Sequence, residues 1–150
     1  MKLSGIIHPE LLDLIAAAGH GDVIVLADAG LRIPEEKARL DLALACGVPT
    51  MAQVVDAVKT ELVIEAATIA TEFEDWNPGV YEDVVGRLPV EPDTKSHEDL
   101  MADMAQRAFA YVKTGECSAY SSVALVCGVN YLDEAVDLYK KLHPDRPSPF

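Results

Sequence analysis

A three-layer α/β/α sandwich, an α/β fold with a mixed, partly parallel sheet, is the architecture that the sequence predicts. Stretches with helical spacing of apolar residues alternate along the chain with short β-branched runs, and this order favours a layered domain. The 150 residues suffice for one domain with a buried core. The composition, 50% hydrophobic and 25% charged, is that of a globular protein.

The first part of the chain predicts a helix followed by a buried strand. Residues 8–19, HPELLDLIAAAG, place Pro9 in the first helical turn and end at Gly19, a residue type that stops helices. Residues 23–27, VIVLA, are a β-branched run between polar turns, as expected of a strand buried on both faces. The polar residues of the flanking turns therefore lie at the two ends of one strand.

The middle of the chain continues the alternation. Alternating leucines suggest a strand within residues 39–47, and Thr50 is a suitable N-cap for a helix over residues 50–61. Residues 62–70, LVIEAATIA, resemble another strand, and residues 77–88 resemble a short helix after an Asn-Pro-Gly break.

The last part predicts two helices around one more strand. Residues 96–115 begin like a capping box and end at a glycine, so most of this segment is expected to be helical. Residues 121–131 follow as a strand. Residues 132–142 have the pattern of an amphipathic helix, with Lys140 and Lys141 near its negative end.

The formal net charge of −13 disfavours two classes of partner. With 12 Lys and Arg residues the chain has no basic excess for nucleic-acid phosphates, and the same argument disfavours an anionic membrane surface. The apolar runs are too short to span a bilayer, and the amino terminus lacks the pattern of a signal peptide. Three cysteines, an odd number without a CxxC pair, suit a reducing compartment better than a disulfide framework. We therefore expect a cytoplasmic protein.

A Gly-His-Gly-Asp tetrapeptide precedes the first predicted strand. Its glycines allow a sharp turn that presents the ring of His20 outward. Asp22 can hydrogen-bond one ring nitrogen, which would fix the tautomer and leave the other nitrogen free for proton transfer. The alternative is an ordinary surface histidine in a loop.

Asp28 directly follows the same strand, at the edge where open α/β sheets bind ligands. A carboxylate in this position can accept hydrogen bonds from two sugar hydroxyl groups. The alternative is a cap for the following turn, which is a common role for aspartate. Placement alone favours neither reading.

Neither a metal nor a nucleotide site is predicted. The 4 histidines have no recognised ligand spacing, and the cysteines do not pair with them in sequence. The glycines form neither GxGxxG nor a phosphate loop. Cys117 is a nucleophile only in principle, because no sequence feature activates it, and Trp76 is interpreted as a packing residue. We expect no cofactor.

Several short motifs occur in one characteristic order. They are GHGD, DAGLRIP, RLDLAL, GVPTMAQV, EAATIA and GECSAYSSVALVCGV. In this order the chain resembles the D-ribose pyranase and L-fucose mutarotase family over roughly its first 130 residues. DAGLRIP is similar to the ribose branch, since the fucose branch usually has a histidine after Asp-Ala.

The resemblance implies a cofactor-free enzyme that interconverts pyranose and furanose forms, or anomers, of a free monosaccharide. D-ribose is the expected substrate, and L-fucose or another sugar is the alternative. His20 would be the catalytic acid/base, oriented by Asp22. The implied sugar-binding residues are Asp28, His97, Tyr120 and Ser122. A non-catalytic sugar-binding accessory protein and a purely structural ring subunit are the alternatives that would not need His20.

The resemblance also implies a ring-shaped homo-oligomer, commonly a decamer of two pentameric rings. This agrees with the spacing along the chain, because a strand holds its ends apart and a neighbouring subunit could bring His20 and Asp28 to one pocket.

Three features depart from the family pattern. Ser122 stands where the family usually has an asparagine, which gives one hydroxyl group in place of an amide. The segment between His97 and Gly115 is about one residue longer than in the ribose branch, so a helix-entry role is the alternative for His97. The third departure is the segment after residue 130, because relatives tend to end soon after the GV strand. We expect a domain over residues 1–130 and a C-terminal helical extension over residues 131–150, packed on the same domain or at a subunit interface.

Overall fold

A single mixed β-sheet organises the computed structural model, which describes residues 2–147. Its six strands follow the order β2-β5-β1-β6-β3-β4. They are β1 (Val23–Ala27), β2 (Ala38–Asp41), β3 (Ile64–Ala70), β4 (Asp93–Lys95), β5 (Ala108–Lys113) and β6 (Val123–Cys127). The pairs β1/β5, β2/β5 and β3/β4 are parallel, whereas β6 runs antiparallel to β1 and to β3. The predicted mixed, partly parallel sheet is confirmed.

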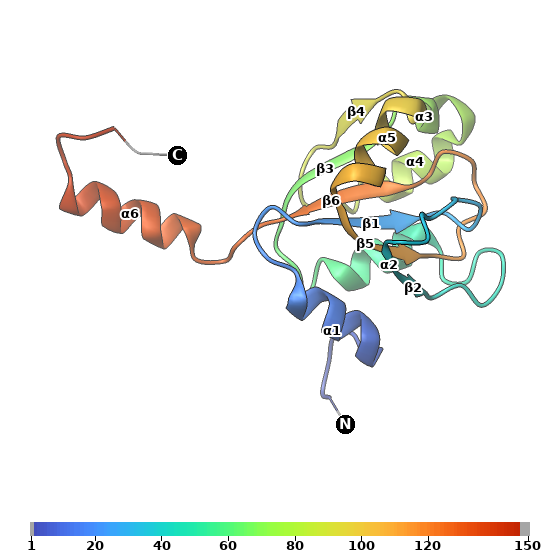
Figure 1. The fold of residues 1–150 in the computed structure, drawn as a ribbon, viewed down its shortest axis with the longest axis horizontal. Coiled ribbons are helices and arrows are strands. Elements are labelled where there is room, and N and C mark those ends of the chain that lie inside the picture. Colours follow the sequence, from blue (N-terminus) through green and yellow to red (C-terminus); the bar gives the residue numbers. More distant parts are fainter. Residues whose placement is uncertain (1, 148–150) are drawn as a thin grey trace.

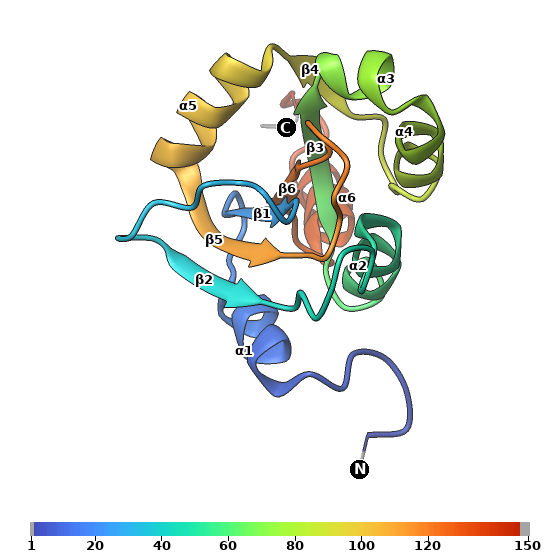
Figure 2. The same cartoon turned by 90° about the vertical axis from the view of Figure 1, so that its right-hand side faces the viewer.

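Helices cover both faces of this sheet and give the three predicted layers. One face carries α1 (Pro9–Ala17), α2 (Met51–Val58) and α4 (Pro78–Val85), whereas α5 (His97–Arg107) covers the other (Figure 2). The short helix α3 (Glu72–Trp76) leads directly into α4. Thr50 caps α2 through the capping-box pair with Gln53, as its sequence position predicts.

The central strand β1 joins the two halves of the core. All five of its residues are buried, and alternate side chains point to opposite faces. Ile24 and Leu26 pack in the cluster that includes α1 and α2, whereas Val25 packs with Leu100 and Met104 of α5. Because each buried aliphatic side chain contributes about 1.5–3 kcal/mol, this double burial fixes the register of β1 and therefore the positions of the turns at its ends.

The helix predicted over most of residues 96–115 is wrong beyond Arg107. Residues 108–113 form β5 instead, which lies between β1 and β2 and pairs in parallel with both. Ala110 and Val112 are fully buried, and two flanking strands satisfy the backbone groups of β5. The sequence pattern also missed β4 and α3, and the strand expected within residues 39–47 ends at Asp41.

The cysteines differ from the expectation drawn from their odd number. Cys46 and Cys117 form a disulfide across a sequence separation of 71 residues, and Cys127 is a buried free thiol. The pairing depends on Gly115, whose N–H donates to Pro49 O at 2.8 Å and whose carbonyl accepts from Gly47 N–H at 2.6 Å. A Cβ atom on Gly115 would lie 2.5 Å from backbone oxygens of the facing turn, so only glycine permits this approach.

The last helix, α6 (Leu132–Leu142), has the predicted bounds but stands away from the domain (Figure 1). None of its residues is buried. The structure therefore does not pack α6 on the same domain, and its position at a subunit interface stays a prediction. Within the described residues, no helix is both long enough and apolar enough to cross a membrane.

Candidate functional site

Asp28 lies at the carboxyl end of β1, where the sequence placed it, and two groups donate hydrogen bonds to its carboxylate. Its Oδ1 accepts from the N–H of Gly30 at 2.9 Å, and its Oδ2 accepts from the hydroxyl of Ser122 at 2.7 Å. The N–H of Asp28 in turn donates to Ser122 Oγ at 3.0 Å. The carboxylate thus caps the turn that follows β1, as one sequence-based reading predicted, and it also borders a cavity, where the other reading places a sugar.

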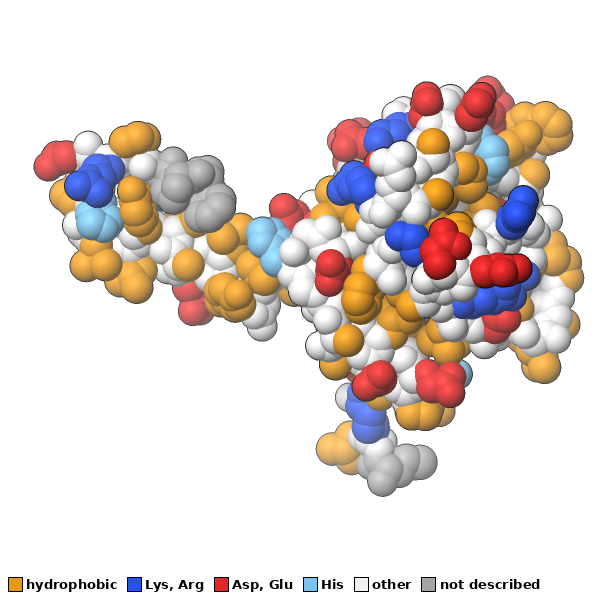
Figure 3. All heavy atoms as spheres, in the orientation of Figure 1, with side chains coloured by type: hydrophobic (Ala, Val, Ile, Leu, Met, Phe, Trp, Pro, Cys, Tyr) orange, Lys and Arg blue, Asp and Glu red, His pale blue; other side chains and the backbone are white. Residues whose placement is uncertain are grey.

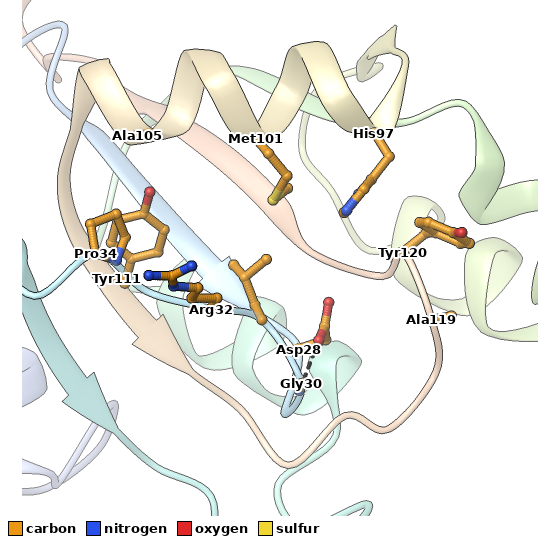
Figure 4. Close-up of a pocket in the computed structure, with 11 residues that line it drawn as sticks. Asp28, Gly30, Arg32, Pro34, His97, Met101, Ala105, Tyr111, Ala119 and Tyr120 are labelled. Atoms are coloured by element: carbon orange, nitrogen blue, oxygen red, sulfur yellow. Dashed lines mark hydrogen bonds between the residues drawn. The ribbon is translucent and has the colours of Figure 1, made fainter.

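The cavity beside Asp28 has a volume of about 580 Å³, a size typical of small-molecule sites. It lies between α5 and the loops that follow β1 and β5 (Figure 4). Its lining comprises Asp28, Gly30, Leu31, Arg32, Pro34, His97, Met101, Ala105, Tyr111, Ala119 and Tyr120. A few polar groups therefore meet in a largely apolar wall, the usual composition of a site that orients a small ligand.

His97 enters this cavity from the first turn of α5 (Figure 4). Its backbone N–H donates to the Glu72 carboxylate at 2.9 and 3.1 Å, and these bonds contribute to lowering the pKa of that carboxyl, after the hydrogen bond from the backbone of Glu72 itself. The ring atom Nδ1 is buried, and no described residue supplies it with a hydrogen-bond partner. A buried ring nitrogen of this kind requires a partner, which a ligand in the cavity would provide.

Tyr120 closes the same side of the cavity. Its ring meets that of His97 edge-to-face, with centroids 4.9 Å apart, and meets that of Trp76 at 5.3 Å. Tyr120 has a φ of +63°, an uncommon conformation for a residue with a Cβ. The adjacent loop is anchored where Asn77 Nδ2–H donates to Ala119 O at 2.7 Å. Trp76 therefore supports the site by packing on Tyr120.

Ser122 does not line the cavity. It is 2% exposed, and its hydroxyl both donates to and accepts from Asp28. Ser122 thus holds the Asp28 side chain and backbone without itself lining the cavity.

His20 lies at the opposite edge of the sheet, before β1. A five-residue strand spans about 16 Å, so one chain does not bring His20 and Asp28 together. The His20 Nε2 atom lies 2.7 Å from Glu65 Oε2, and both side chains are about half exposed, at 47% and 49%. Glu65 reaches His20 because β1 and β3 both run antiparallel to β6, which places their first residues at the same edge.

The predicted hydrogen bond between Asp22 and His20 is not formed in the structure. The Asp22 carboxylate instead accepts from the N–H of Gly19 at 2.8 Å and thereby closes the turn before β1. Aspartate commonly holds a turn in this way, because its short side chain reaches its own neighbouring backbone.

Two residues at these ends of the strands were not predicted from the sequence. Arg32 lines the cavity and is the last-but-two residue of the DAGLRIP motif, so the motif itself contained the signal. Glu65 lies in the EAATIA motif, but its contact with His20 depends on strand order. Among residues 2–147 we find no cluster of three or more His, Cys, Asp or Glu side chains arranged to hold a metal ion.

The fold and the cavity define a small-molecule-binding α/β domain. The chain belongs to the RbsD / FucU transport protein family, whose sequence model matches residues 1–130, and the family resemblance of the sequence motifs is confirmed. The chain is 43% identical to the D-ribose pyranase of Geobacillus thermodenitrificans over 131 residues, covering 87% of this chain and 99% of that protein. It is 44% identical to the D-ribose pyranase of Paracidovorax citrulli over 131 residues, covering 87% of this chain and 100% of that protein.

Solved structures give the same assignment of fold. The structure of Bacillus subtilis RbsD complexed with D-ribose matches with a TM-score of 0.75 and 31% identity, covering 86% of this chain and 98% of that one. The fucose mutarotase of Streptococcus pneumoniae in complex with L-fucose matches with a TM-score of 0.63 at 24% identity, covering 82% and 94% of the two chains, and supports the fold alone.

Proposed function

We propose that this protein is a monosaccharide pyranase, an isomerase that interconverts the pyranose and furanose forms of free D-ribose without a cofactor. The observation that carries the proposal is the unpartnered Nδ1 of His97, buried in a cavity that the Asp28 carboxylate also lines. Sugar hydroxyl groups both donate and accept, so they suit this acceptor-rich pair. The relatives named D-ribose pyranase, which match along nearly their whole length, support the same substrate.

Ring opening requires two proton transfers. A base removes the proton of the anomeric hydroxyl group and, once protonated, gives a proton to the ring oxygen, which opens the ring. Attack by another hydroxyl group on the open-chain aldehyde then changes the ring size. Attack by the same hydroxyl group, after the carbonyl has rotated, changes only the anomer. We assign the proton transfers to His20, because imidazole exchanges protons near neutral pH and such catalysis gives about 10²–10⁴-fold. Asp28, His97 and Tyr120 would hold the sugar, and Ser122 would hold Asp28.

A complete site would need two subunits. His20 and Asp28 lie at opposite ends of β1, so we propose that the His20 edge of one copy meets the Asp28 cavity of its neighbour in a ring-shaped homo-oligomer, a decamer of two rings. Co-expressed chains carrying His20→Ala and Asp28→Asn test this arrangement. Mixed oligomers should regain roughly a quarter of the sites, because each site draws its two residues from different chains. Absence of any recovery in verified mixed oligomers would contradict the shared site.

A non-catalytic sugar-binding accessory protein is the second candidate. One observation favours it: Asp28, His97 and Tyr120 meet within one chain, whereas His20 lies elsewhere. Such a protein would bind ribose and would not accelerate its interconversion. We place either function in the cytoplasm, where a free sugar meets the kinases that phosphorylate it.

NMR saturation transfer between the pyranose and furanose signals of D-ribose separates these candidates. Wild-type protein should accelerate the exchange, and His20→Ala should abolish the acceleration while ribose still binds. Acceleration of L-fucose anomer exchange alone would reassign the substrate. Binding without acceleration of any sugar would favour the accessory protein, and neither binding nor acceleration across a monosaccharide panel would refute both candidates.

A further inference from the structure

The helix α6 presents an apolar face that no described part of the chain covers. None of its 11 residues is buried, and Leu138 and Leu142 are 57% and 65% exposed. At about 3.6 residues per turn the apolar side chains fall within one broad stripe. The stripe comprises Leu132, Ala135, Val136, Leu138, Tyr139 and Leu142. An isolated helix of this length is marginally stable in water, so its stripe requires a partner.

Figure 1 shows α6 as an arm beyond the body of the domain, and Figure 3 shows hydrophobic side chains on the visible face of this arm. Residues 131–147, which we call the arm, hold four acidic and three basic side chains. The arm is therefore nearly neutral, and the rest of the chain carries almost all of the −13 charge. Two copies of this chain would meet the least electrostatic repulsion at their arms.

Four charged side chains border the apolar stripe of α6, one acid and one lysine on each side. Asp133 and Lys140 lie about two turns apart along one border, and Glu134 and Lys141 lie about two turns apart along the other. On both borders the acid is in the first turn and the lysine in the last. Asp137 lies on the side of the helix opposite the stripe.

We propose that α6 pairs in antiparallel orientation with α6 of a second copy of this chain. In an antiparallel pair each border meets the same border of the other copy in reverse, so each acid approaches a lysine. In a parallel pair the two different borders would meet, and acids would approach acids. Antiparallel packing also sets the two helix dipoles against each other favourably.

The register of this pair follows from the same charges. Aligning each acid with the opposite lysine places the two-fold axis near the level of Asp137, whose side chain points away from the contact. A two-fold interface is self-complementary, so a single helix sequence supplies both halves. The inference uses only the arm and does not depend on the proposed pyranase activity.

Zero-length carbodiimide cross-linking of the full chain tests the pair. The reagent joins a carboxylate to an amine only where the two are in contact, and mass spectrometry identifies the linked peptides. Wild-type protein should give covalent dimers that link Asp133 to Lys140 or Glu134 to Lys141. Within one helix these partners lie about 10 Å apart along the axis, so the links must join two chains.

Charge variants supply the matched controls. An acidic arm, Lys140→Glu with Lys141→Glu, has no lysine left for the reagent to join, and a basic arm, Asp133→Lys with Glu134→Lys, has lost the two acids that border the stripe, so neither should form these links with itself. Co-expression of the two should restore the links between unlike arms. These changes leave the apolar stripe and the domain intact, and circular dichroism verifies that the helix is retained.

The proposal is overturned if helical wild-type arms give no interchain acid–lysine links, whether because α6 folds back, binds a membrane or pairs in parallel. It is also overturned if co-expressed acidic and basic arms give no links between unlike arms.

Discussion

Replacing Ser122 by alanine should destabilise the protein and disorganise its candidate site at the same time. The Ser122 hydroxyl donates to Asp28 Oδ2 at 2.7 Å and accepts from the N–H of Asp28 at 3.0 Å. Ser122 and Asp28 are 2% and 9% exposed, so solvent does not readily replace the lost oxygen. Ser122→Ala therefore leaves one carboxylate oxygen and one backbone N–H without their partner.

The size of the effect follows from these two losses. A hydrogen bond to a charged group contributes about 1.5–3 kcal/mol, and a buried donor left unsatisfied costs about 1–3 kcal/mol. Both bonds share one oxygen, so the losses do not add in full. We expect the free energy of unfolding to fall by about 2–3 kcal/mol. Loss of the fixed carboxylate orientation should weaken ribose binding about tenfold, which corresponds to about 1.4 kcal/mol.

Ser121→Ala is the matched control for this measurement. Ser121 is fully buried like its neighbour, but its hydroxyl donates to the neutral carbonyl of Ser118 at 2.8 Å. Its loss should cost about 1 kcal/mol and leave ribose binding nearly unchanged. Urea unfolding at constant m-value measures the stability of both variants, and ribose titration followed by NMR measures affinity. Equal destabilisation by the two variants, or unchanged ribose affinity in Ser122→Ala, would refute the argument.

Three further predictions concern other residues. Glu65→Gln removes the ion pair with His20 and should slow ribose exchange about 2–5-fold without changing KM, because an exposed ion pair contributes only about 0.2–1 kcal/mol of stabilisation. An unchanged rate in the NMR exchange assay would show that Glu65 does not act on His20. Arg32→Met should raise KM roughly 2–5-fold at constant kcat, and a fall in kcat instead would show that Arg32 acts on the transition state. Burial, and secondly the charge of Asp22, raise the pKa of the Cys127 thiol from 9.0 to about 11 in the folded protein. As the pH rises from about 9 to 11, the thiol therefore ionises in the unfolded chain before it ionises in the folded one, and the free energy of unfolding should decrease. Cys127→Ala should flatten this decrease in pH-dependent urea unfolding, and an unaltered slope would contradict the assignment.

Local pattern predicted most of the fold. β1 and α2 were predicted because their own residues carry the signal, a β-branched run in one and a capped apolar stripe in the other. β5 was missed because AFAYVK has no local turn to separate it from α5. Its strand geometry is imposed by β1 and β2 on either side, and such long-range pairing overrides a weak local preference.

The residues of the candidate site also fall into those that local motifs predicted and those whose contacts depend on distant strands. Asp28, His97 and Tyr120 were predicted from motifs and do meet at one cavity. The partner of His20 was not predicted correctly, because the sequence neighbour Asp22 is occupied by its own turn while Glu65 arrives from another strand. Sequence proximity is therefore a poor guide to hydrogen-bond partners at strand ends, where neighbouring strands contribute side chains from distant positions.

The separation of His20 and Asp28 by the length of β1 has a consequence for subunit stoichiometry. Under the proposed shared site, each contact between successive subunits completes one active site. An open row of subunits would leave one unused His20 edge at one end and one unused cavity at the other. A closed ring leaves none, so ring closure would make the number of complete sites equal to the number of chains.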